Sequence, residues 1–425
     1  MPFYTGGVNL NDFFFTDQDI VDQYVNQTGQ IWTWGKNYSE TVTGLLGQGY
    51  KNGGFSVTEP TVITDYYWTQ ISCASHRDTF TAKISAITAD NKLYSWGANN
   101  YGQHGNNTTI GASAPAQEIT GGTTWKKVAS GVGFTAAIKT DGTLWTWGRN
   151  HLGQLGDNTT TDRSSPVQTV TRGTEWKDVA CGLAHMAAIK TDGTLWLWGN
   201  NGVFAYDNFN SIDCSGCLGD NTVVNKSSPI QTITRGVNWK QVSCNGSYTA
   251  AVKTDGTLWL WGPNATGNLG NNTTVGASSP VQTITGGTTW RQVSCDSGRG
   301  YYSDIRGTTA AVKTDGTLWM WGSNAYGQLG DNTTVQRSSP VQTVSGGTNW
   351  KKVSNGSSTT AAIKQDGTLW MWGDNNLFIF QTQAIGMLGD GTTVDKSSPV
   401  QTLGGKSWSQ VTCGWHFTGA IQQTD

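Results

Sequence analysis

Short runs of apolar and small residues recur along the chain in a fixed order, separated by glycine, proline and polar residues. A clean copy contains Trp125-Lys-Lys-Val-Ala, then Phe134-Thr-Ala-Ala-Ile-Lys, then Leu144-Trp-Thr-Trp-Gly, and finally Pro166-Val-Gln-Thr-Val. Runs of this length and composition, bounded by turn residues, are typical of β-strands. The repeats contain no helical periodicity. Each copy is therefore predicted to fold as four antiparallel strands.

The turns and faces of these strands follow from the same pattern. Thr140-Asp-Gly-Thr joins the second run to the third, and Asp-Gly predicts a two-residue hairpin with positive φ at both central positions. Pro166 opens the fourth run, which suits a strand start or an outer edge. Because side chains alternate along a strand, Trp145 and Trp147 share one face and Leu144 the other. Both faces are thus expected to be covered.

The repeat occurs seven times. Third runs end in Trp-Gly at Trp34, Trp96, Trp147, Trp198, Trp261, Trp321 and Trp372, and first runs open at Trp68, Trp125, Trp176, Trp239, Trp290, Trp350 and Trp408. The regular spacing, from Trp96 to Trp147 to Trp198, is 51 residues. A period this long is typical of propellers and solenoids.

The two ends of the chain carry complementary parts of one repeat. Gly419-Ala-Ile-Gln-Gln-Thr-Asp matches a second strand, whereas Gly29-Gln-Ile-Trp-Thr-Trp-Gly supplies a third strand and Pro60-Thr-Val-Ile a fourth. The predicted fold is all-β: a seven-bladed β-propeller of four-stranded antiparallel blades over residues 28–425, closed by pairing N- and C-terminal strands in one blade. Residues 1–27 stand outside the repeat and are predicted to form an extended N-terminal arm.

A known family carries the same motifs. Trp-Gly-x-Asn-x-x-Gly-Gln-Leu-Gly at Trp147 and Trp321, with Cys-Gly-x-x-His at Cys181, resembles the regulator of chromosome condensation repeat. The resemblance covers residues 29–425 and implies a seven-bladed propeller. The family includes a nucleotide-exchange factor for a small GTPase, chromatin binders, a secreted β-lactamase inhibitor, and bacterial and phage proteins. Fold analogy alone therefore does not assign an activity.

Composition and motifs exclude several function classes. A net charge of −2 and a pI near 6.2 provide no basic stripe for phosphates, so nucleic-acid binding is not expected. No secretory signal opens the chain and no apolar run approaches ~18 residues, so membrane insertion is not expected. The recurring aspartates are turn residues, and the sequence contains neither a Gly-x-Ser-x-Gly elbow nor a phosphate loop. We expect no enzyme activity and no cofactor.

The cysteines raise the question of a metal site. One repeat position, at the end of the first strand, holds Cys73, Cys181, Cys244, Cys295 and Cys413, with Ser130 and Asn355 in its other copies. This exchange favours small residues packed near a central channel. Cys214-Ser-Gly-Cys217 lies in an insertion and lacks two further ligands, so a loop disulfide or two free thiols are expected rather than a metal.

Departures from the repeat fall on one face of the predicted ring. If the first strand is innermost, the loops after strands one and three emerge together, opposite the Asp-Gly turns. The insertions lengthen these loops, and they contain residue types that dominate binding hot spots. The predicted binding residues are Phe204, Tyr206, Phe209, Arg299, Tyr301, Tyr302, Arg306, Phe378, Phe380, Trp415 and His416. The alternative is that these side chains pack on their own loops or plug the channel.

These features together favour a structural or interaction protein. The leading hypothesis is a phage virion appendage or decoration protein at the virion surface, displaying the insertion loops to a protein or host surface. Its arm would bind other virion proteins through Phe13, Phe14, Phe15, Ile20 and Tyr24, unless the arm is a strap packed on the propeller. The alternatives are a carbohydrate-binding propeller, or an inhibitor or exchange-factor-like module, with a bacterial extracellular or cytoplasmic location.

Overall fold

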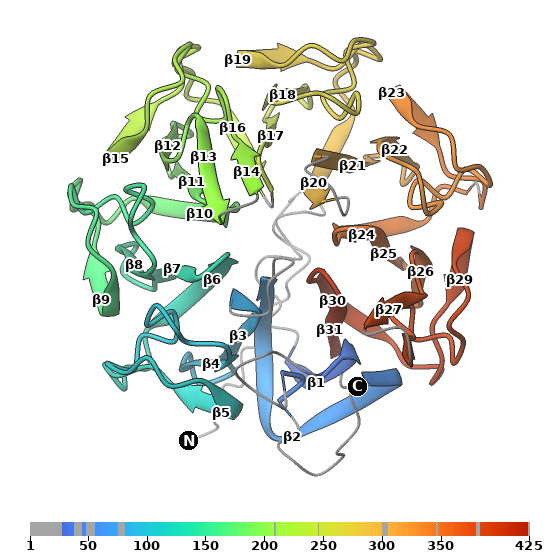
Figure 1. The fold of residues 1–425 in the computed structure, drawn as a ribbon, viewed down its shortest axis with the longest axis horizontal. Coiled ribbons are helices and arrows are strands. Elements are labelled where there is room, and N and C mark those ends of the chain that lie inside the picture. The colour runs from blue at the N-terminus through green and yellow to red at the C-terminus, as the bar shows by residue number, and fades with distance from the viewer. Residues whose placement is uncertain are drawn as a thin grey trace, which may run out of the picture.

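The protein forms a closed ring of β-sheets around a central axis (Figure 1). The structure is a computed structural model that describes residues 28–37, 45–47, 56–74, 81–207, 210–244, 246–299, 305–345, 347–379 and 383–423. The predicted arm, residues 1–27, lies outside the described residues. In the described part of the chain, no helix is long and apolar enough to cross a membrane.

Six blades follow one another along the chain, and each pairs its strands in sequence order. Blade 1 consists of the C-terminal part of β2 (Ser56–Ala74), β3 (Lys83–Thr88), β4 (Leu93–Gly97) and β5 (Ala112–Gln117). Blade 2 consists of β6 (Trp125–Gly131), β7 (Phe134–Lys139), β8 (Leu144–Gly148) and β9 (Arg163–Gln168). Blade 3 consists of β10 (Trp176–Cys181), β11 (His185–Lys190), β12 (Leu195–Gly199) and β15 (Lys226–Gln231). Blade 4 consists of β16 (Trp239–Ser243), β17 (Thr249–Lys253), β18 (Leu258–Gly262) and β19 (Ala277–Gln282). Blade 5 consists of β20 (Trp290–Arg299), β21 (Ile305–Lys313), β22 (Leu318–Gly322) and β23 (Arg337–Gln342). Blade 6 consists of β24 (Trp350–Asn355), β25 (Thr359–Lys364), β26 (Leu369–Gly373) and β29 (Lys396–Gln401).

The seventh, closing blade is assembled from both ends of the chain, as predicted. Its order is β30 (Trp408–Cys413), β31 (Phe417–Gln422), β1 (Gly29–Lys36) and the N-terminal part of β2. Strand β1 pairs with β31 from Ile31 opposite Ile421 to Gly35 opposite Phe417. Blue and red strands accordingly lie side by side in Figure 1.

Strand β2 serves two blades, which the sequence pattern did not predict. Its 19 residues run without a break from the outer strand of the closing blade to the inner strand of blade 1. Between the other blades the connector turns at residues with positive φ, such as Gly121 and Arg172. The stretch from Ile63 to Trp68 contains no residue with positive φ, and the chain there stays extended.

The Asp-Gly hairpins differ from the predicted two-residue turn. Gly142 has φ of +81°, but Asp141 does not have positive φ. Lys139 donates its N–H to the Thr143 carbonyl at 2.9 Å and accepts one from Gly142 at 2.9 Å. The loop therefore has three residues, a type I turn followed by a left-handed glycine. Asp141 Oδ1 stabilises it by accepting the Thr143 N–H at 2.9 Å.

The fourth strand begins earlier than predicted. Strand β9 starts at Arg163, so Pro166 lies within it rather than at its start. The register against β8 is irregular between Thr146 and Gly148. Because proline has no N–H to donate, an irregular stretch of an outer edge strand accommodates it.

Tryptophan and glycine residues form recurring contacts between adjacent blades. Six indoles donate to a main-chain carbonyl of the preceding blade at 2.8–3.0 Å, those of Trp34, Trp147, Trp198, Trp261, Trp321 and Trp372. A left-handed glycine lies against the same indole: a Cβ at Gly156, for example, would be 2.7 Å from Trp198 Nε1. These contacts place most of the core between blades.

The first strands surround a central cavity of about 240 Å³, lined by residues of all seven blades. Cys73, Cys181 and Cys244 contribute to its wall, which confirms that this cysteine position packs near the channel. Burial raises the pKa of the Cys181 thiol to about 12. These thiols are therefore protonated near neutral pH.

Candidate binding face

One face of the ring carries the loops after the first and third strands of every blade; we call it the insertion face. The strand order requires this, because each blade begins with its innermost strand and alternates direction outward. The Asp-Gly turns and the connectors between blades occupy the opposite face. The predicted division of the two faces is thereby confirmed for the described residues.

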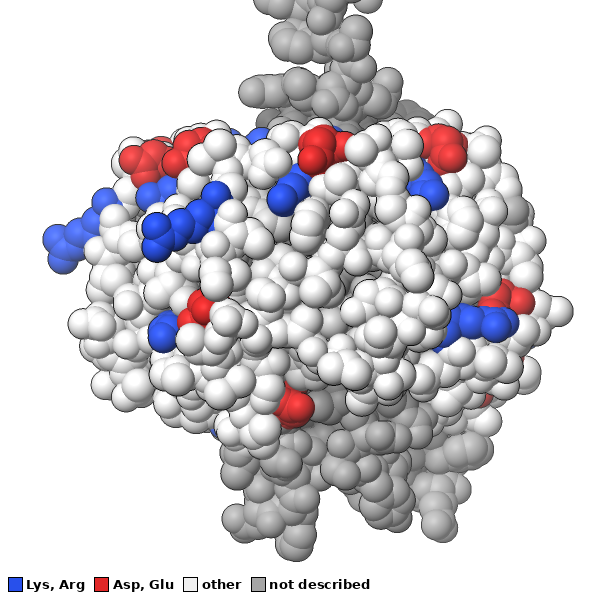
Figure 2. Space-filling view, turned by 90° about the horizontal axis from the view of Figure 1, so that it is seen from above, with Lys and Arg blue, Asp and Glu red and all other residues white. Residues whose placement is uncertain are grey.

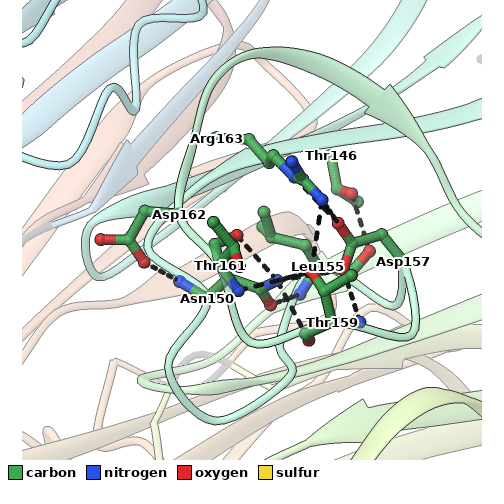
Figure 3. Close-up of polar contacts among 8 residues, drawn as sticks. All are labelled: Thr146, Asn150, Leu155, Asp157, Thr159, Thr161, Asp162 and Arg163. Carbon is green, nitrogen blue, oxygen red and sulfur yellow. Dashed lines mark hydrogen bonds and ion pairs between the residues drawn. The ribbon is translucent and has the colours of Figure 1, made fainter.

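An asparagine organises each loop after a third strand. In blade 2, Asn150 Nδ2 donates to Asp157 Oδ1 at 3.0 Å and to the Thr161 carbonyl at 3.1 Å, while its Oδ1 accepts the Leu155 N–H at 2.9 Å. Arg163 Nε holds Asp157 Oδ2 at 3.0 Å. Figure 3 shows these side chains converging inside the loop. They satisfy one another, so they support the loop rather than form a ligand site.

The long insertions leave this support intact. In blade 3, Asn201 still holds Asp220 at 3.0 Å and accepts the Leu218 N–H at 2.9 Å. Between them stands a separate hairpin of β13 (Val203–Asp207) and β14 (Asn210–Asp213). Blade 6 carries a similar hairpin of β27 (Leu377–Ile379) and β28 (Gln383–Ile385). Both hairpins are additions to a complete blade.

The third insertion extends the inner hairpin of blade 5. Strands β20 and β21 continue pairing beyond Cys295 as far as Arg299 opposite Ile305. Arg306 pairs with Gly298 in the same ladder. The predicted residues Arg299 and Arg306 therefore lie on this extension, although their side chains lie outside the described residues.

The other predicted binding residues have different outcomes. Phe204 lies on β13, half-buried, and packs partly against the core of its own blade. Tyr206 and Phe378 lie on β13 and β27, with side chains outside the described residues. Phe209, Tyr301, Tyr302 and Phe380 also lie outside them.

Trp415 and His416 form a pair in the loop between β30 and β31. Both residues are half-buried, and their ring centroids are 5.0 Å apart at 36°. The His416 carbonyl accepts the Lys36 N–H at 2.7 Å. Burial, and then the charge of Lys36, lowers the pKa of His416 well below its ordinary value, so this ring is neutral at pH 7. Phe204 belongs to blade 3 and the pair to the closing blade, with blades 1 and 2 between them, so the structure does not unite all predicted residues in one patch.

A row of four side chains crosses three neighbouring blades of the insertion face, and only its last member was predicted. The Arg149 guanidinium lies over the Tyr101 ring at 5.0 Å, Arg149 Nε donates to His151 Nδ1 at 2.9 Å, and the His151 and Phe204 rings meet edge to face at 6.3 Å. We call Tyr101, Arg149, His151 and Phe204 the aromatic–arginine row. His151 is the most exposed of the four, and the other three are half-buried.

The electrostatics of this row favour a mixed apolar and hydrogen-bonding contact. Partial burial, and then the neighbouring Arg149, lowers the pKa of His151 to about 4. The imidazole is therefore neutral at pH 7, and Arg149 is the cation of the row. Around the ring, as the side view in Figure 2 shows, charges of both signs are sparse on a largely uncharged surface. On the insertion face, the row itself supplies arginine and aromatic side chains, the residue types that dominate binding hot spots.

Family models match the repeat directly. The model described as the regulator of chromosome condensation (RCC1) repeat matches residues 90–138, 141–189, 315–363 and 366–421, and a second model of the same repeat matches residues 125–154, 176–204 and 350–377. Together these ranges cover just over half of the chain. The chain belongs to the RCC1 repeat family. The predicted family and propeller fold are confirmed, whereas the narrower phage or bacterial type stays a prediction.

Named relatives have diverse roles. The chain is 28% identical over 345 residues to the ultraviolet-B receptor UVR8 of Arabidopsis thaliana, covering 80% of this chain and 72% of that protein. It is 27% identical over 398 residues to the human E3 ubiquitin-protein ligase HERC2, spanning 91% of this chain but 7% of the ligase. The yeast Prp20p structure, whose title names binding to Gsp1p and histones, matches with a TM-score of 0.75 at 18% identity, covering 96% of each chain. That likeness concerns the fold alone.

Two clusters were missed by reasoning from the sequence. The aromatic–arginine row depends on contacts between blades, which no single repeat reveals. His185 was noted, but the structure places it within 4.8 Å of Cys214 and Cys217. Aligning Cys217 with Gln154 of the regular blade gives its repeat position, because both precede the Leu-Gly pair that follows the third strand, but it does not reveal the contact with His185.

Proposed function

We propose that this propeller is a protein-interaction module whose insertion face binds a partner, with no chemistry of its own. One observation carries the proposal: three insertions and the aromatic–arginine row depart from the repeat on the same face. The asparagine-centred supports keep each blade complete beneath them. Additions that a scaffold does not need for folding are typical of recognition loops.

Similarity to named relatives supports an interaction role without naming the partner. A ring of this family is compatible with receptor, ligase-associated and histone-binding proteins, as the names above indicate. The ligase relative matches over 7% of its own length, so its name does not argue for ligase activity here. An exchange-factor-like role is the alternative that the family resemblance implies.

Matched surface variants test the proposal. Arg149→Ala removes the cation of the row, whereas Lys126→Ala removes an exposed cation near the opposite end of the same blade. A third variant lacks residues 202–213, which shortens the distance from Trp198 to Leu218 from 20 positions to the regular 8. Each immobilised protein is incubated with lysate of the source, and captured proteins are quantified by mass spectrometry.

We expect a partner captured by the unaltered protein and by Lys126→Ala, and reduced at least about fivefold by Arg149→Ala or the deletion. That reduction corresponds to about 1 kcal/mol, a modest loss for one hot-spot arginine. Near-ultraviolet circular dichroism verifies that all variants remain folded. Equal capture by all four proteins would contradict binding through the insertion face.

The narrower hypothesis assigns the module to a virion surface, anchored by residues 1–27. Its support is the sequence of this segment, with Phe13, Phe14 and Phe15 beside a polar stretch. The test compares capture of virion components by the full chain and by a chain without residues 1–27. We expect capture only by the full chain; equal capture would refute the anchor while leaving the insertion-face proposal in place.

A further inference from the structure

The inserted loop of blade 3 brings three metal-ligand side chains together. His185 is the first residue of β11, and Cys214 and Cys217 follow β14. One ligand atom from each residue lies within 4.8 Å of the other two, and all three side chains are fully buried. Zinc–sulfur and zinc–nitrogen bonds of about 2.3 and 2.0–2.1 Å place ligand atoms within such distances of one another.

A hydrogen-bond relay prepares the histidine for a metal. Thr249 Oγ1 donates to the Cys217 carbonyl at 2.8 Å, so its oxygen accepts from His185 Nε2 at 3.1 Å. In the neutral ring the proton therefore sits on Nε2, and Nδ1 offers a lone pair. Among the described residues, Nδ1 is buried with no hydrogen-bond partner. Metal-bound histidines are typically oriented by such a bond from the second ring nitrogen.

The thiols suit the same ligand. The two cysteines are free in the structure, in agreement with one of the two states expected for them. Cys217 donates its N–H to the Cys214 carbonyl at 3.0 Å, and this turn brings both sulfur atoms close to the His185 ring. Cys217 Sγ lies 3.0 Å from the Asn200 carbonyl oxygen. That oxygen, or a water molecule, could complete a tetrahedron.

The other inserted blade provides an internal comparison. In blade 6, Met387 occupies the place of Cys217, and Thr359 that of His185. Its hairpin nevertheless stands on the same asparagine support, with Leu388 donating to Asn375 at 2.9 Å. An insertion therefore does not require these ligands for its architecture, and their presence in blade 3 needs its own explanation.

We propose that His185, Cys214 and Cys217 bind a zinc ion that fixes the base of the β13–β14 hairpin to blade 3. The sequence argument against a metal was that the Cys-x-x-Cys pair lacks further ligands; the fold supplies a third. Zinc suits two thiolates and an imidazole. The ion would replace an unpaired nitrogen and two buried thiols by three coordinate bonds, holding the hairpin in one position on the insertion face.

The test measures zinc on the full-length protein. The protein is reduced with a phosphine that does not bind the metal, incubated with zinc sulfate and freed of excess by gel filtration. We expect about one zinc ion per chain, measured by plasma mass spectrometry. Cys214→Ser and Cys217→Ser should lose it, whereas Cys413→Ser, which alters a buried thiol outside the cluster, should retain it.

Two further measurements distinguish a loss of zinc binding from a folding defect in the variants. Cobalt added to the reduced, unaltered protein should produce an intense near-ultraviolet thiolate charge-transfer band, and a chelator should lower the melting temperature of the zinc-loaded protein. Reduced, folded protein that binds no zinc above the Cys214→Ser/Cys217→Ser background would overturn the proposal and leave a redox-active or inert thiol pair. Zinc retained by that double variant would overturn it as well.

Discussion

A single residue departs from the repeat where blade 1 meets its neighbour. In the other six blades a buried leucine precedes the glycine that contacts the next indole, at Leu46, Leu155, Leu218, Leu269, Leu329 and Leu388. His104 takes this place in blade 1 and is fully buried. Burial, and then the charge of Lys83, lowers the pKa of His104 to about 3. The folded protein therefore keeps this imidazole neutral.

We predict that His104→Leu stabilises the protein and reduces its sensitivity to acid. Leucine fits this place in six blades, and removing a buried polar ring should contribute about 1–2 kcal/mol at pH 7. The unfolded chain binds a proton at His104 near pH 6.5 and the folded chain near 3. The stability linked to this group is therefore complete above pH 6.5 and is lost as pH falls toward 3. Urea midpoints at pH 7 and pH 5 measure both effects.

The comparison controls for the other histidines. His151 and His416 also have lowered pKa values, but they remain in both proteins and their effects largely cancel. The stability difference between the variant and the unaltered chain should widen from pH 7 to pH 5, by up to about 1.4 kcal/mol for each pH unit below the unfolded pKa. A constant difference would show that His104 is not held neutral by burial.

The burial of a side chain could be predicted where the same residue recurs at the same position of several repeats. The contacts of a residue that occurs in one repeat alone could not. Trp198 and Trp261 are buried as expected because each copy presents the same strand to the same neighbour. His185 and Cys214 are 29 positions apart, and the β13–β14 insertion separates them. Their proximity depends on where that insertion returns to the blade, which a strand pattern does not encode.

The sequence predicted which segments form strands and turns better than it predicted where each one begins and ends. Strands β7 and β8 match the predicted second and third runs residue for residue. The errors have backbone causes: Asp-Gly permits two hairpin geometries, and only Gly142 adopts positive φ. Pro166 enters an edge strand because its missing donor is tolerated there. The residue type limits which backbone conformations are allowed, and pairing with the neighbouring strand determines which of them is adopted.

Contacts between blades depend on glycines that propensity alone would treat as turns. We predict that Gly156→Ala destabilises the ring more than Gly121→Ala. Both glycines have positive φ, +66° and +59°, but a Cβ at Gly156 would meet Trp198 Nε1 at 2.7 Å, whereas a Cβ at Gly121 has no atom within 4 Å. Both substitutions share a backbone cost of about 1 kcal/mol. The clash should add about 1–3 kcal/mol for Gly156→Ala.

Denaturant unfolding followed by tryptophan fluorescence measures this difference. Gly156→Ala should also disturb the bond from Trp198 Nε1 to the Gln154 carbonyl, which is 3.0 Å long, and therefore shift the emission of the folded state. Gly121→Ala is the matched control because it changes φ preference without changing packing. Equal losses in the two variants would mean that the glycine–indole contact adds nothing to stability.

Ring closure was predictable because it follows from counting. Seven tryptophan motifs and complementary terminal runs leave one blade to be completed from both ends, and β31 pairs with β1 accordingly. The partition of the faces follows from strand order. The surface chemistry does not, because the row from Tyr101 to Phe204 spans three blades. Which loops meet across the ring depends on side-chain reach rather than on topology.

We predict that a circular permutant of the ring folds. Gln423 would be joined through one aspartate to Gly29, without residues 424–425 and 1–28, and new termini would open between Gly286 and Gly287, where a Cβ meets no atom within 4 Å. The joint recreates the three-residue hairpin of the other blades, since Gln423 donates to the Ser407 carbonyl at 2.8 Å as Thr140 does to Thr124 at 2.7 Å. Exposed connectors tolerate new termini. Its melting temperature should lie within a few degrees of the original, because every strand keeps its paired neighbours.

A permutant that also lacks β31 tests whether the ring depends on the pairing of β1 with β31 or on the covalent order of its strands. Without this strand, β1 and β30 would become open edges in the closing blade, and unpaired edges favour aggregation. We expect this control to lose the single cooperative transition and to sediment as aggregates, while the complete permutant remains monodisperse. If the complete permutant also failed to fold, the pairing of β1 with β31 would not be what holds the ring together, and the closing blade would depend on a covalent order of strands that its geometry does not require.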